Sequence, residues 1–299
     1  MIPFVNAYRA LPGAVRGGLL IAFSTLTLSC MQGSVRYVAS TGMHPFEIGF
    51  FRLLFGGLIF LPVIWRHGWA PFHTRNLGLH ALRASVQTVS MLSFFFALTI
   101  TPFAKAIALE FTGPLFAAIV AMVILGEKLR MRRIGALVFG YLGVLVVIRP
   151  GFIEIDAGVM LVMLSALSWG TVMVIVKLAG RGDNSITITL YMVTFSTPIC
   201  FLAALTVWTT PTLVQLAWLV MIGVLGSLGH LAIAQALREA EMTAIIPFDF
   251  LRMIWVSLIG YLAFAEIPDI WTWIGAIMIF SAATYISYRE SRQRAKEKA

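Results

Sequence analysis

Charged side chains are scarce in this sequence. Only 12% of the 299 residues are Asp, Glu, Lys or Arg, whereas 60% are hydrophobic, and the mean hydropathy is +0.91. A soluble domain of this size could not cover so much apolar surface with so few polar side chains. The composition therefore excludes an ordinary soluble globular fold and predicts a polytopic membrane protein.

Cysteine is also nearly absent. Cys30 and Cys200 each lie inside an apolar stretch, which favours a packing role over a disulfide or a metal site. We find no His-Glu-x-x-His, Walker-type Gly-x-x-x-x-Gly-Lys, Gly-x-Ser-x-Gly or paired-aspartate signature. We therefore expect no cofactor, no metal and no enzymatic activity, and an intramembrane enzyme is the weakest alternative.

The sequence is rich in apolar segments of near-spanning length. There are ten of them, at residues 14–35, 46–65, 77–98, 103–125, 134–149, 157–178, 186–208, 213–235, 244–265 and 270–288. With both termini in the cytoplasm, 16 of the 22 Lys and Arg residues fall on the cytoplasmic side and three on the other. The net charge of +9 is therefore interpreted as a topology signal, the basic tail 289–299 as a solvated end, and no nucleic-acid partner is expected.

One apolar stretch occurs twice. Glu110 and Asp249 each lie within a hydrophobic segment, and a second acid, Glu127 or Glu266, follows 17 residues later. About 25 Å of helix separates the two acids of each copy, so we expect one within the membrane and one at its edge. A shift of 139 residues superimposes the two copies, which indicates an internal duplication.

Each copy belongs to a block of five predicted helices, residues 1–150 and residues 151–288. Because five crossings is an odd number, the second block is inserted upside down relative to the first. We therefore predict an all-α polytopic membrane protein of ten transmembrane helices arranged as two inverted five-helix repeats. That arrangement is typical of secondary transporters, because two related halves give two similar states that open to opposite sides.

The duplicated stretch also carries a family resemblance. Residues 95–98, 104–110, 113–117 and 125–129, with a second copy at 234–238 and 265–268, resemble the central motif of the ten-helix drug/metabolite transporter superfamily, EamA type. The second copy has Met253 where a proline equivalent to Pro114 is common. Taken whole, the chain is similar to YddG-type bacterial exporters of aromatic amino acids. The resemblance implies a multi-pass protein of the bacterial plasma (inner) membrane.

Ionisable groups inside the predicted helices form a first candidate set, because such groups usually face the bundle interior or a water-filled path. Counting from the helix ends places Glu110 and Arg52 in the outer half of the membrane and Asp249 and Arg83 in the inner half. We interpret these groups as gating or coupling networks, with Arg252 near the middle. The equally weighted alternative is that each acid only joins helices through hydrogen bonds.

Polar and aromatic side chains form a second set, the predicted substrate contacts. Gln87, Ser90, Trp169, His230 and Gln235 offer donors or acceptors, and Phe94, Trp169 and Tyr191 offer an aromatic wall. Lipid or helix contact is the favoured interpretation for Phe94 and Tyr191, and substrate contact for Trp169. His80, His230 and the two intramembrane acids are candidate proton carriers, so proton antiport and facilitated diffusion both stay open. For the two histidines, the alternative of an interior side chain that only satisfies its hydrogen bonds has at least equal weight.

We therefore expect a secondary transporter that exports amino acids, aromatic ones in particular, by alternating access. A broad-specificity drug or metabolite exporter is the alternative within transport. A structural or receptor-like bundle is disfavoured, because a passive scaffold does not need an inverted duplication. The expected partners are a small-molecule substrate of the amino-acid or related metabolite class, membrane lipid and, in the proton-coupled version, protons.

Overall fold

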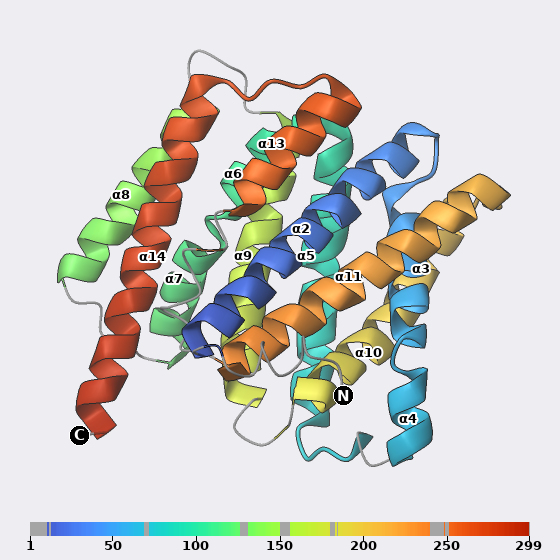
Figure 1. Cartoon of the computed structure of the whole chain (residues 1–299), viewed down its shortest axis with the longest axis horizontal. Coiled ribbons are helices and arrows are strands. Elements are labelled where there is room, and N and C mark those ends of the chain that lie inside the picture. Colours follow the sequence, from blue (N-terminus) through green and yellow to red (C-terminus); the bar gives the residue numbers. More distant parts are fainter. Residues whose placement is uncertain are drawn as a thin grey trace.

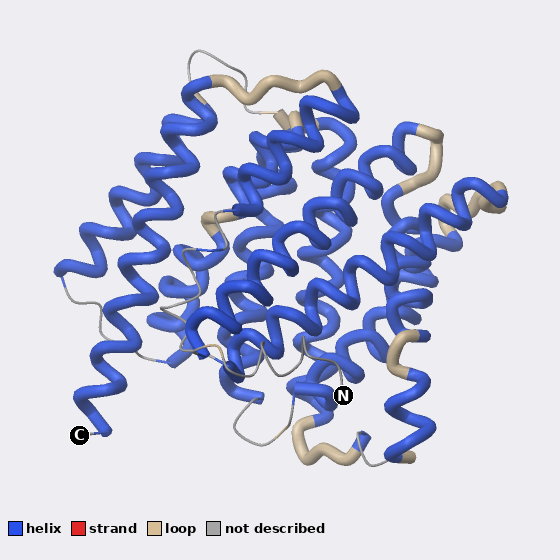
Figure 2. Tube along the Cα trace, in the orientation of Figure 1, coloured by secondary structure: helices blue, strands red, loops and turns tan. Residues whose placement is uncertain are grey.

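The structure is a computed structural model that describes residues 11, 13–68, 72–125, 131–149, 156–179, 183, 185–239, 248 and 251–298. These residues form helices joined by short loops, with no strand among them (Figure 2). The helices are α2 (Gly13–Ser40), α3 (Pro45–Leu58), α4 (Leu61–His67), α5 (Leu77–Ile100), α6 (Phe103–Glu110), α7 (Gly113–Leu125), α8 (Met131–Ile148), α9 (Ala157–Ala179), α10 (Ser185–Leu205), α11 (Leu213–Glu239), α13 (Leu251–Phe264) and α14 (Ile270–Lys298).

The bilayer explains why this sequence folds only into helices where it is described. Lipid offers no hydrogen-bond partner, so the backbone of each crossing must satisfy itself within its own helix. Six stretches are long and apolar enough to span: Val15–Ser40, Leu77–Ile100, Phe103–Ile124, Ala157–Val176, Ile186–Leu205 and Leu213–Ile233. Shorter apolar helices cover Gly135–Ile148, Leu251–Phe264 and Ile270–Ala282. Large apolar side chains such as Val123 and Leu262 point outward, where lipid solvates them.

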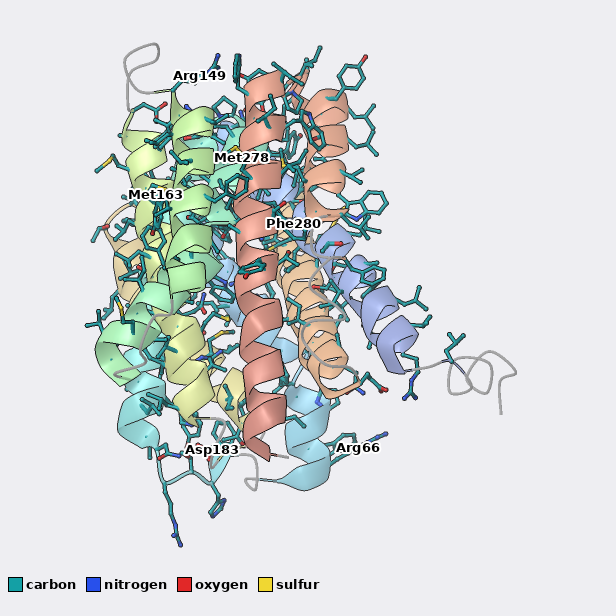
Figure 3. All side chains as sticks on the ribbon, turned by 90° about the vertical axis from the view of Figure 1, so that its left-hand side faces the viewer. Arg66, Arg149, Met163, Asp183, Met278 and Phe280 are labelled. Carbon is teal, nitrogen blue, oxygen red and sulfur yellow. The ribbon has the colours of Figure 1, made fainter. Side chains whose placement is uncertain are left out.

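The helices form a bundle with two clearly distinct ends (Figure 1). The start of α2 and the end of α14 lie toward the lower side of the view, and the connection from α13 to α14 runs along the upper side. The same two ends appear in Figure 3, where Arg149 lies near the upper end and Asp183 near the lower end. The terms lower side and upper side are used in this sense below. The protein is thus an all-α membrane protein of ten crossings, in two inverted repeats of five.

Two crossings that we predicted as continuous are broken. The segment predicted at 46–65 divides into α3 and α4 around Ile59 and Phe60. The segment predicted at 103–125 divides into α6 and α7 at Phe111 and Thr112, where the Thr112 N–H donates to the Leu109 carbonyl over 3.0 Å in a tighter turn. Pro114 contributes to the second break, because it lacks the N–H that would have bonded the carbonyl four residues earlier.

Glycine pairs bring two sets of helices into backbone contact. A Cβ added to Gly223 of α11 would lie 2.8 Å from the backbone nitrogen of Gly56 in α3. A Cβ added to Gly275 of α14 would lie 2.6 Å from the carbonyl oxygen of Gly143 in α8. These glycines therefore permit close helix approach at these positions. Gly135, eight residues before Gly143 in α8, has no described atom within 4 Å of such a Cβ.

Candidate functional site

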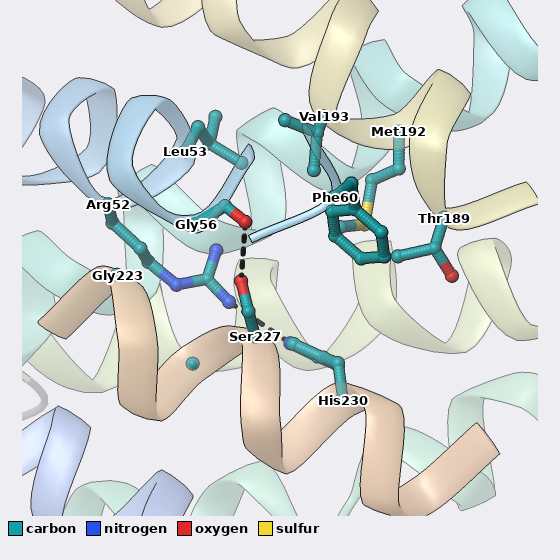
Figure 4. A pocket seen from close by; sticks show the side chains of 11 residues that line it. Arg52, Leu53, Gly56, Phe60, Thr189, Met192, Val193, Gly223, Ser227 and His230 are labelled. Atoms are coloured by element: carbon teal, nitrogen blue, oxygen red, sulfur yellow. Dashed lines mark hydrogen bonds between the residues drawn. The ribbon is translucent and has the colours of Figure 1, made fainter. Parts of the chain in front are cut away.

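A small, mostly apolar cleft lies where helices of the two repeats meet (Figure 4). Its cavity volume is about 20 Å³, which leaves room for about one water molecule. Helix α3 of the first repeat lines one side, and α10 and α11 of the second repeat line the other. The lining residues are Arg52, Leu53, Gly56, Phe60, Thr189, Met192, Val193, Gly223, Gly226, Ser227 and His230.

Arg52 is the most strongly polar group of the cleft, and it is 9% exposed. Its Nη2 donates to Nε2 of His230 over 3.0 Å, which joins two residues 178 positions apart. Two further contacts are to thioethers: Nε lies 3.3 Å from the sulfur of Met31 in α2, and Nη1 lies 2.8 Å from the sulfur of Met91 in α5. The guanidinium carbon also lies 5.8 Å from the centroid of the Phe95 ring. The guanidinium therefore sits at the junction of α2, α3, α5 and α11.

The sequence folds this way locally because small residues of α11 leave room for the guanidinium. A Cβ on Gly226 would lie 3.2 Å from Nε of Arg52 and 3.3 Å from the sulfur of Met31. The next residue, Ser227, donates its hydroxyl to the Gly56 carbonyl over 3.0 Å and holds α11 against α3 (Figure 4). The close approach of α3 and α11 thus brings Arg52 to His230.

His230 is surrounded by positive charge. An arginine has only donors, so Nε2 of His230 accepts from Arg52 and the ring is neutral, with its proton on Nδ1. The charges of Arg52, Arg83 and Arg252 all act on this ring. Three predicted gating residues therefore act electrostatically on one predicted substrate contact, and Arg52 also touches it.

Arg83 of α5 approaches the same region from the side of α10. It is 8% exposed, and its Nη1 donates to the Ile188 carbonyl over 2.6 Å. Its Nη2 lies 3.8 Å from the sulfur of Met192, which lines the cleft, and its Nε has no hydrogen-bond partner. Arg83 thus lies behind the cleft wall, with part of its donor capacity unused.

Glu110 and Arg252 form an ion pair between the two repeats. Nη2 of Arg252 lies 2.5 Å from Oε2 of Glu110, and both side chains are 15% exposed. Glu110 is the last residue of α6, at the break of the fourth crossing, and α13 begins only one residue before Arg252. The depth counting had grouped Glu110 with Arg52, and the structure instead pairs it with Arg252, because α13 packs directly beside α6.

The other predicted substrate contacts are distributed along α5, α9, α10 and α11. Ser90 donates to the Ser165 carbonyl of α9 over 3.0 Å, and Phe94 is buried at 3% exposure in the main apolar core. The Oε1 atom of Gln87 is buried and has no hydrogen-bond partner. Trp169 packs against the start of α7, with its Cδ1 atom 3.0 Å from a Cβ added to Gly113.

Three predicted residues lie elsewhere or outside the description. Tyr191 donates its hydroxyl to the Phe72 carbonyl over 2.6 Å and stacks on the ring of His80 at 4.9 Å. Gln235 is exposed and donates to Glu239 over 2.8 Å. Asp249 lies outside the described residues, as does Glu127. The structure therefore brings Arg52 and His230 together in the cleft and leaves Tyr191 and Gln235 with partners of their own.

Ion pairs close the upper side. Arg36 of α2 pairs with Glu266 and also donates to the Thr101 carbonyl over 2.9 Å, while Glu266 accepts from the Phe103 N–H over 2.7 Å. Arg149, near the upper end in Figure 3, pairs with Asp269. These contacts join α2 to the α5–α6 and α13–α14 loops, so the first and second repeats are tied together at this end.

Asp183 joins the repeats at the lower side. Burial of its carboxyl acts to raise the pKa, but hydrogen bonds from Asn76, Thr74 and His80 outweigh it and lower the pKa below the usual range. The distances are 3.1 Å from Asn76 Nδ2, 2.8 Å from Thr74 Oγ1 and 3.0 Å from His80 Nε2. The loop before α10 is thereby anchored to the start of α5.

Sequence reasoning missed several of these partners. Glu47 is completely buried, and it accepts from the Thr209 N–H over 2.7 Å and from the His44 N–H over 3.2 Å. Its position three residues after the His44 cap, with Pro45 between, is a recognisable capping-box signal. No pattern in the sequence marks Met31 and Met91 as partners of Arg52. Among the described residues, no cluster of three or more His, Cys, Asp or Glu could hold a metal ion.

Two inverted five-helix repeats around a charged interior cleft are the architecture of a secondary membrane transporter. The chain matches the EamA-like transporter family over residues 15–149 and again over residues 156–288. It therefore belongs to that family, which lies within the drug/metabolite transporter superfamily. One family match in each half agrees with the internal duplication predicted from the sequence.

Named relatives align along almost the whole chain. An S-adenosylmethionine uptake transporter of Rickettsia bellii is 28% identical over 93% of this chain and 97% of its own length. A riboflavin transporter of Vibrio cholerae is 26% identical over 95% of this chain and 97% of its own length. The pseudopaline exporter CntI of Pseudomonas aeruginosa is 22% identical over 91% of this chain and 95% of its own length. One solved crystal structure, described only as that of a protein, matches with a TM-score of 0.61 at 15% identity over 93% of this chain and 98% of its own, which supports the fold alone. The protein is a membrane transporter and not an enzyme.

Proposed function

We propose that this protein moves a small polar metabolite across the bacterial plasma membrane by alternating access. The observation that carries the proposal is the Arg52–His230 contact, which joins α3 of the first repeat to α11 of the second beside the cleft. Ionisable groups at such a place usually serve a substrate or ion path. We propose residues 1–150 and 151–288 as the two units that rock against each other, with residues 289–299 as a cytoplasmic tail.

The cargo that we propose first is S-adenosylmethionine or a compound like it. This choice follows the named relatives, and it keeps part of the expectation from the sequence, because S-adenosylmethionine joins an amino-acid group to an aromatic purine. Export of aromatic amino acids is the second candidate, supported by Trp169, which packs where the fourth crossing breaks. Without a coupling ion, the direction of net transport follows the cargo gradient, so uptake and export use the same cycle.

We propose Gln87, Ser90, Phe94, Trp169, Tyr191, His230 and Gln235 as substrate contacts in the course of the cycle. Gln87 has the best support, because its buried Oε1 lacks a partner and such an atom is stabilised by a ligand donor. We propose Arg52, Arg83, Glu110, Asp249 and Arg252 as the gating or coupling group. Since the upper side is tied by Arg36 and Glu266, opening on that side requires this pair to separate.

Both termini are proposed to face the cytoplasm. The excess of Lys and Arg in the loops and ends that share a side with the termini supports this orientation. The start of α2 and the end of α14 also lie on one side of the bundle (Figure 1). Reaction of a single cysteine placed at residue 298 with an impermeant reagent in intact cells tests the orientation, and labelling from outside would reverse it.

The test of the function is flux in proteoliposomes that contain only this purified protein. Labelled S-adenosylmethionine, riboflavin, phenylalanine and tryptophan are offered separately, with and without an imposed pH gradient. Trp169→Ala is compared with Trp271→Ala, whose side chain is 47% exposed on α14 and serves as the matched control. Saturable flux that is lost in Trp169→Ala and kept in Trp271→Ala supports the proposal. Absence of flux for all four compounds with folded protein would refute it.

A further inference from the structure

Among the described residues, no carboxylate contacts the guanidinium of Arg52. Its partners there are the sulfurs of Met31 and Met91, the neutral ring of His230 and the ring of Phe95, whose centroid lies 5.8 Å from the guanidinium carbon. The thiol of Cys200 also acts on it electrostatically. Buried arginines are normally paired with a carboxylate, because removing an unpaired charge from water is unfavourable. The positive charge of Arg52 is thus not balanced by a described carboxylate when the cleft is empty.

The two thioethers are well suited to be displaced. A thioether sulfur is a weak acceptor, so exchanging it for a carboxylate oxygen strengthens the hydrogen bond to the guanidinium. Methionine side chains are also unbranched and flexible, so they can move aside without a shift of the backbone. The methionines therefore hold the Arg52 guanidinium in place, while its N–H donors stay available for a stronger acceptor.

Arg83 adds a second positive charge on the other side of Met192. Its Nη2 lies 3.8 Å from the Met192 sulfur, and its buried Nε has no partner. Glu110 does not neutralise these arginines directly, since it is paired with Arg252. The cleft therefore presents Arg52 at its wall and Arg83 behind it, and a negative group that enters meets both charges.

We propose that Arg52 is the receptor for a carboxylate of the cargo, with Arg83 in support, so that the transported metabolite carries at least one carboxylate. This inference rests on the proposed transport function and specifies its substrate class. A carboxylate oxygen takes the position on Nη1 that the Met91 sulfur holds in the empty protein, and His230 keeps its contact with Nη2. A neutral cargo of the same size lacks the group that this fork is built to receive.

The first test uses no ligand and compares thermal unfolding of the purified full chain in nanodiscs. Arg52→Met removes an uncompensated charge, so its unfolding midpoint is expected to equal or exceed that of the wild type. The matched control is Arg36→Met, which leaves Glu266 without its cation and is expected to lower the midpoint. If Arg52→Met lowers the midpoint as much as Arg36→Met does, Arg52 is a structural staple and the proposal is wrong.

The second test uses S-adenosylmethionine and its decarboxylated form, which differ only in the carboxylate. Binding of S-adenosylmethionine, measured as a rise in the unfolding midpoint, is expected to be about tenfold to a hundredfold tighter than binding of the decarboxylated form. Arg52→Met is expected to bind the two forms equally. Arg52→Lys keeps the charge without the fork and is expected to fall between Arg52→Met and the wild type.

The outcomes separate this inference from the proposed function. Equal binding of both forms by the wild type, or flux of riboflavin with none of S-adenosylmethionine, overturns the carboxylate receptor and leaves a metabolite transporter. Absence of flux for every compound refutes the transport proposal, and the midpoint of Arg52→Met still decides whether Arg52 is a staple. Preference for the carboxylate form that disappears in Arg52→Met supports the receptor.

Discussion

The Glu110–Arg252 pair gives the sharpest quantitative prediction. We consider Glu110→Gln, Arg252→Gln and the double variant, which remove one charge, the other and both. The pair is joined at 2.5 Å and both side chains are 15% exposed, so it lies between a surface pair and a fully buried one. A surface ion pair contributes about 0–1 kcal/mol to stability, whereas removing one partner of a buried pair costs about 3–5 kcal/mol. We therefore expect each single variant to lose about 2–3 kcal/mol of the free energy of unfolding.

The double variant is expected to be little worse than either single variant, because removing both charges leaves no unpaired charge. The coupling free energy is then about 2 kcal/mol. Glu110 also has interactions beyond Arg252, so Glu110→Gln is expected to be at least as harmful as Arg252→Gln. In thermal unfolding each single variant should lower the midpoint by roughly 4–12 °C, if about 2–4 °C corresponds to 1 kcal/mol.

The assay is thermal unfolding in nanodiscs at one scan rate, because irreversible unfolding makes midpoints depend on the rate. The matched control is the same cycle on Arg16 and Glu239, which lie 2.8 Å apart with exposures of 26% and 17% at the end of the bundle. That pair should show a coupling of about 1 kcal/mol or less. Additive losses at Glu110 and Arg252, with no coupling, would show that the short contact does not stabilise the protein and would refute the reasoning.

Three further predictions concern stability at the ends of the bundle and at the glycine contacts. Because the pKa of Asp183 is lowered in the folded state, its contribution to the free energy of unfolding is present above the ordinary carboxyl value of 3.8 and is lost as the pH falls through the folded-state pKa. Asp183→Asn should therefore destabilise the protein at pH 7. The difference in stability from the wild type, measured in urea titrations, should shrink below about pH 4. Gly275→Ala places a Cβ 2.6 Å from the Gly143 carbonyl oxygen and should lower the free energy of unfolding by about 1–3 kcal/mol. Gly135→Ala, with open space around its Cβ, should raise it by up to about 1 kcal/mol. Equal thermal unfolding midpoints of the two variants would contradict this packing. Glu47→Gln places an amide among N–H donors and should lose about 1–3 kcal/mol, and an unchanged midpoint would mean that the Thr209 contact is dispensable.

Much of the fold was predictable because the bilayer imposes strong local rules. Apolar segments must become helices in lipid, so the ten crossings follow from hydrophobicity alone. The duplication follows from the matched spacing of Glu110 and Glu127 with Asp249 and Glu266, and the inversion follows from the odd number of crossings. The helix breaks were not predicted, although Pro114 carries a signal for the second one.

The candidate site was only partly predictable. Ionisable residues such as Arg52 and Arg83 stand out in an apolar segment by composition, and His230 was selected for the same reason. Their partners did not stand out, because the partners of Arg52 include methionines, which look like ordinary core residues in a sequence. The pairing of Glu110 with Arg252 was not predicted either, since depth along a helix says nothing of the direction in which a side chain points.

The sequence by itself therefore determined the class of the protein, its repeated design and the residues that are costly to bury. The tertiary structure decided which of those residues meet. Arg52 faces His230 across 178 positions of sequence only because Gly56 and Gly223 let α3 and α11 approach and Gly226 leaves space for the guanidinium. Such contacts depend on the rotation and spacing of helices from different repeats, and these are properties of packing that local hydrophobicity does not encode.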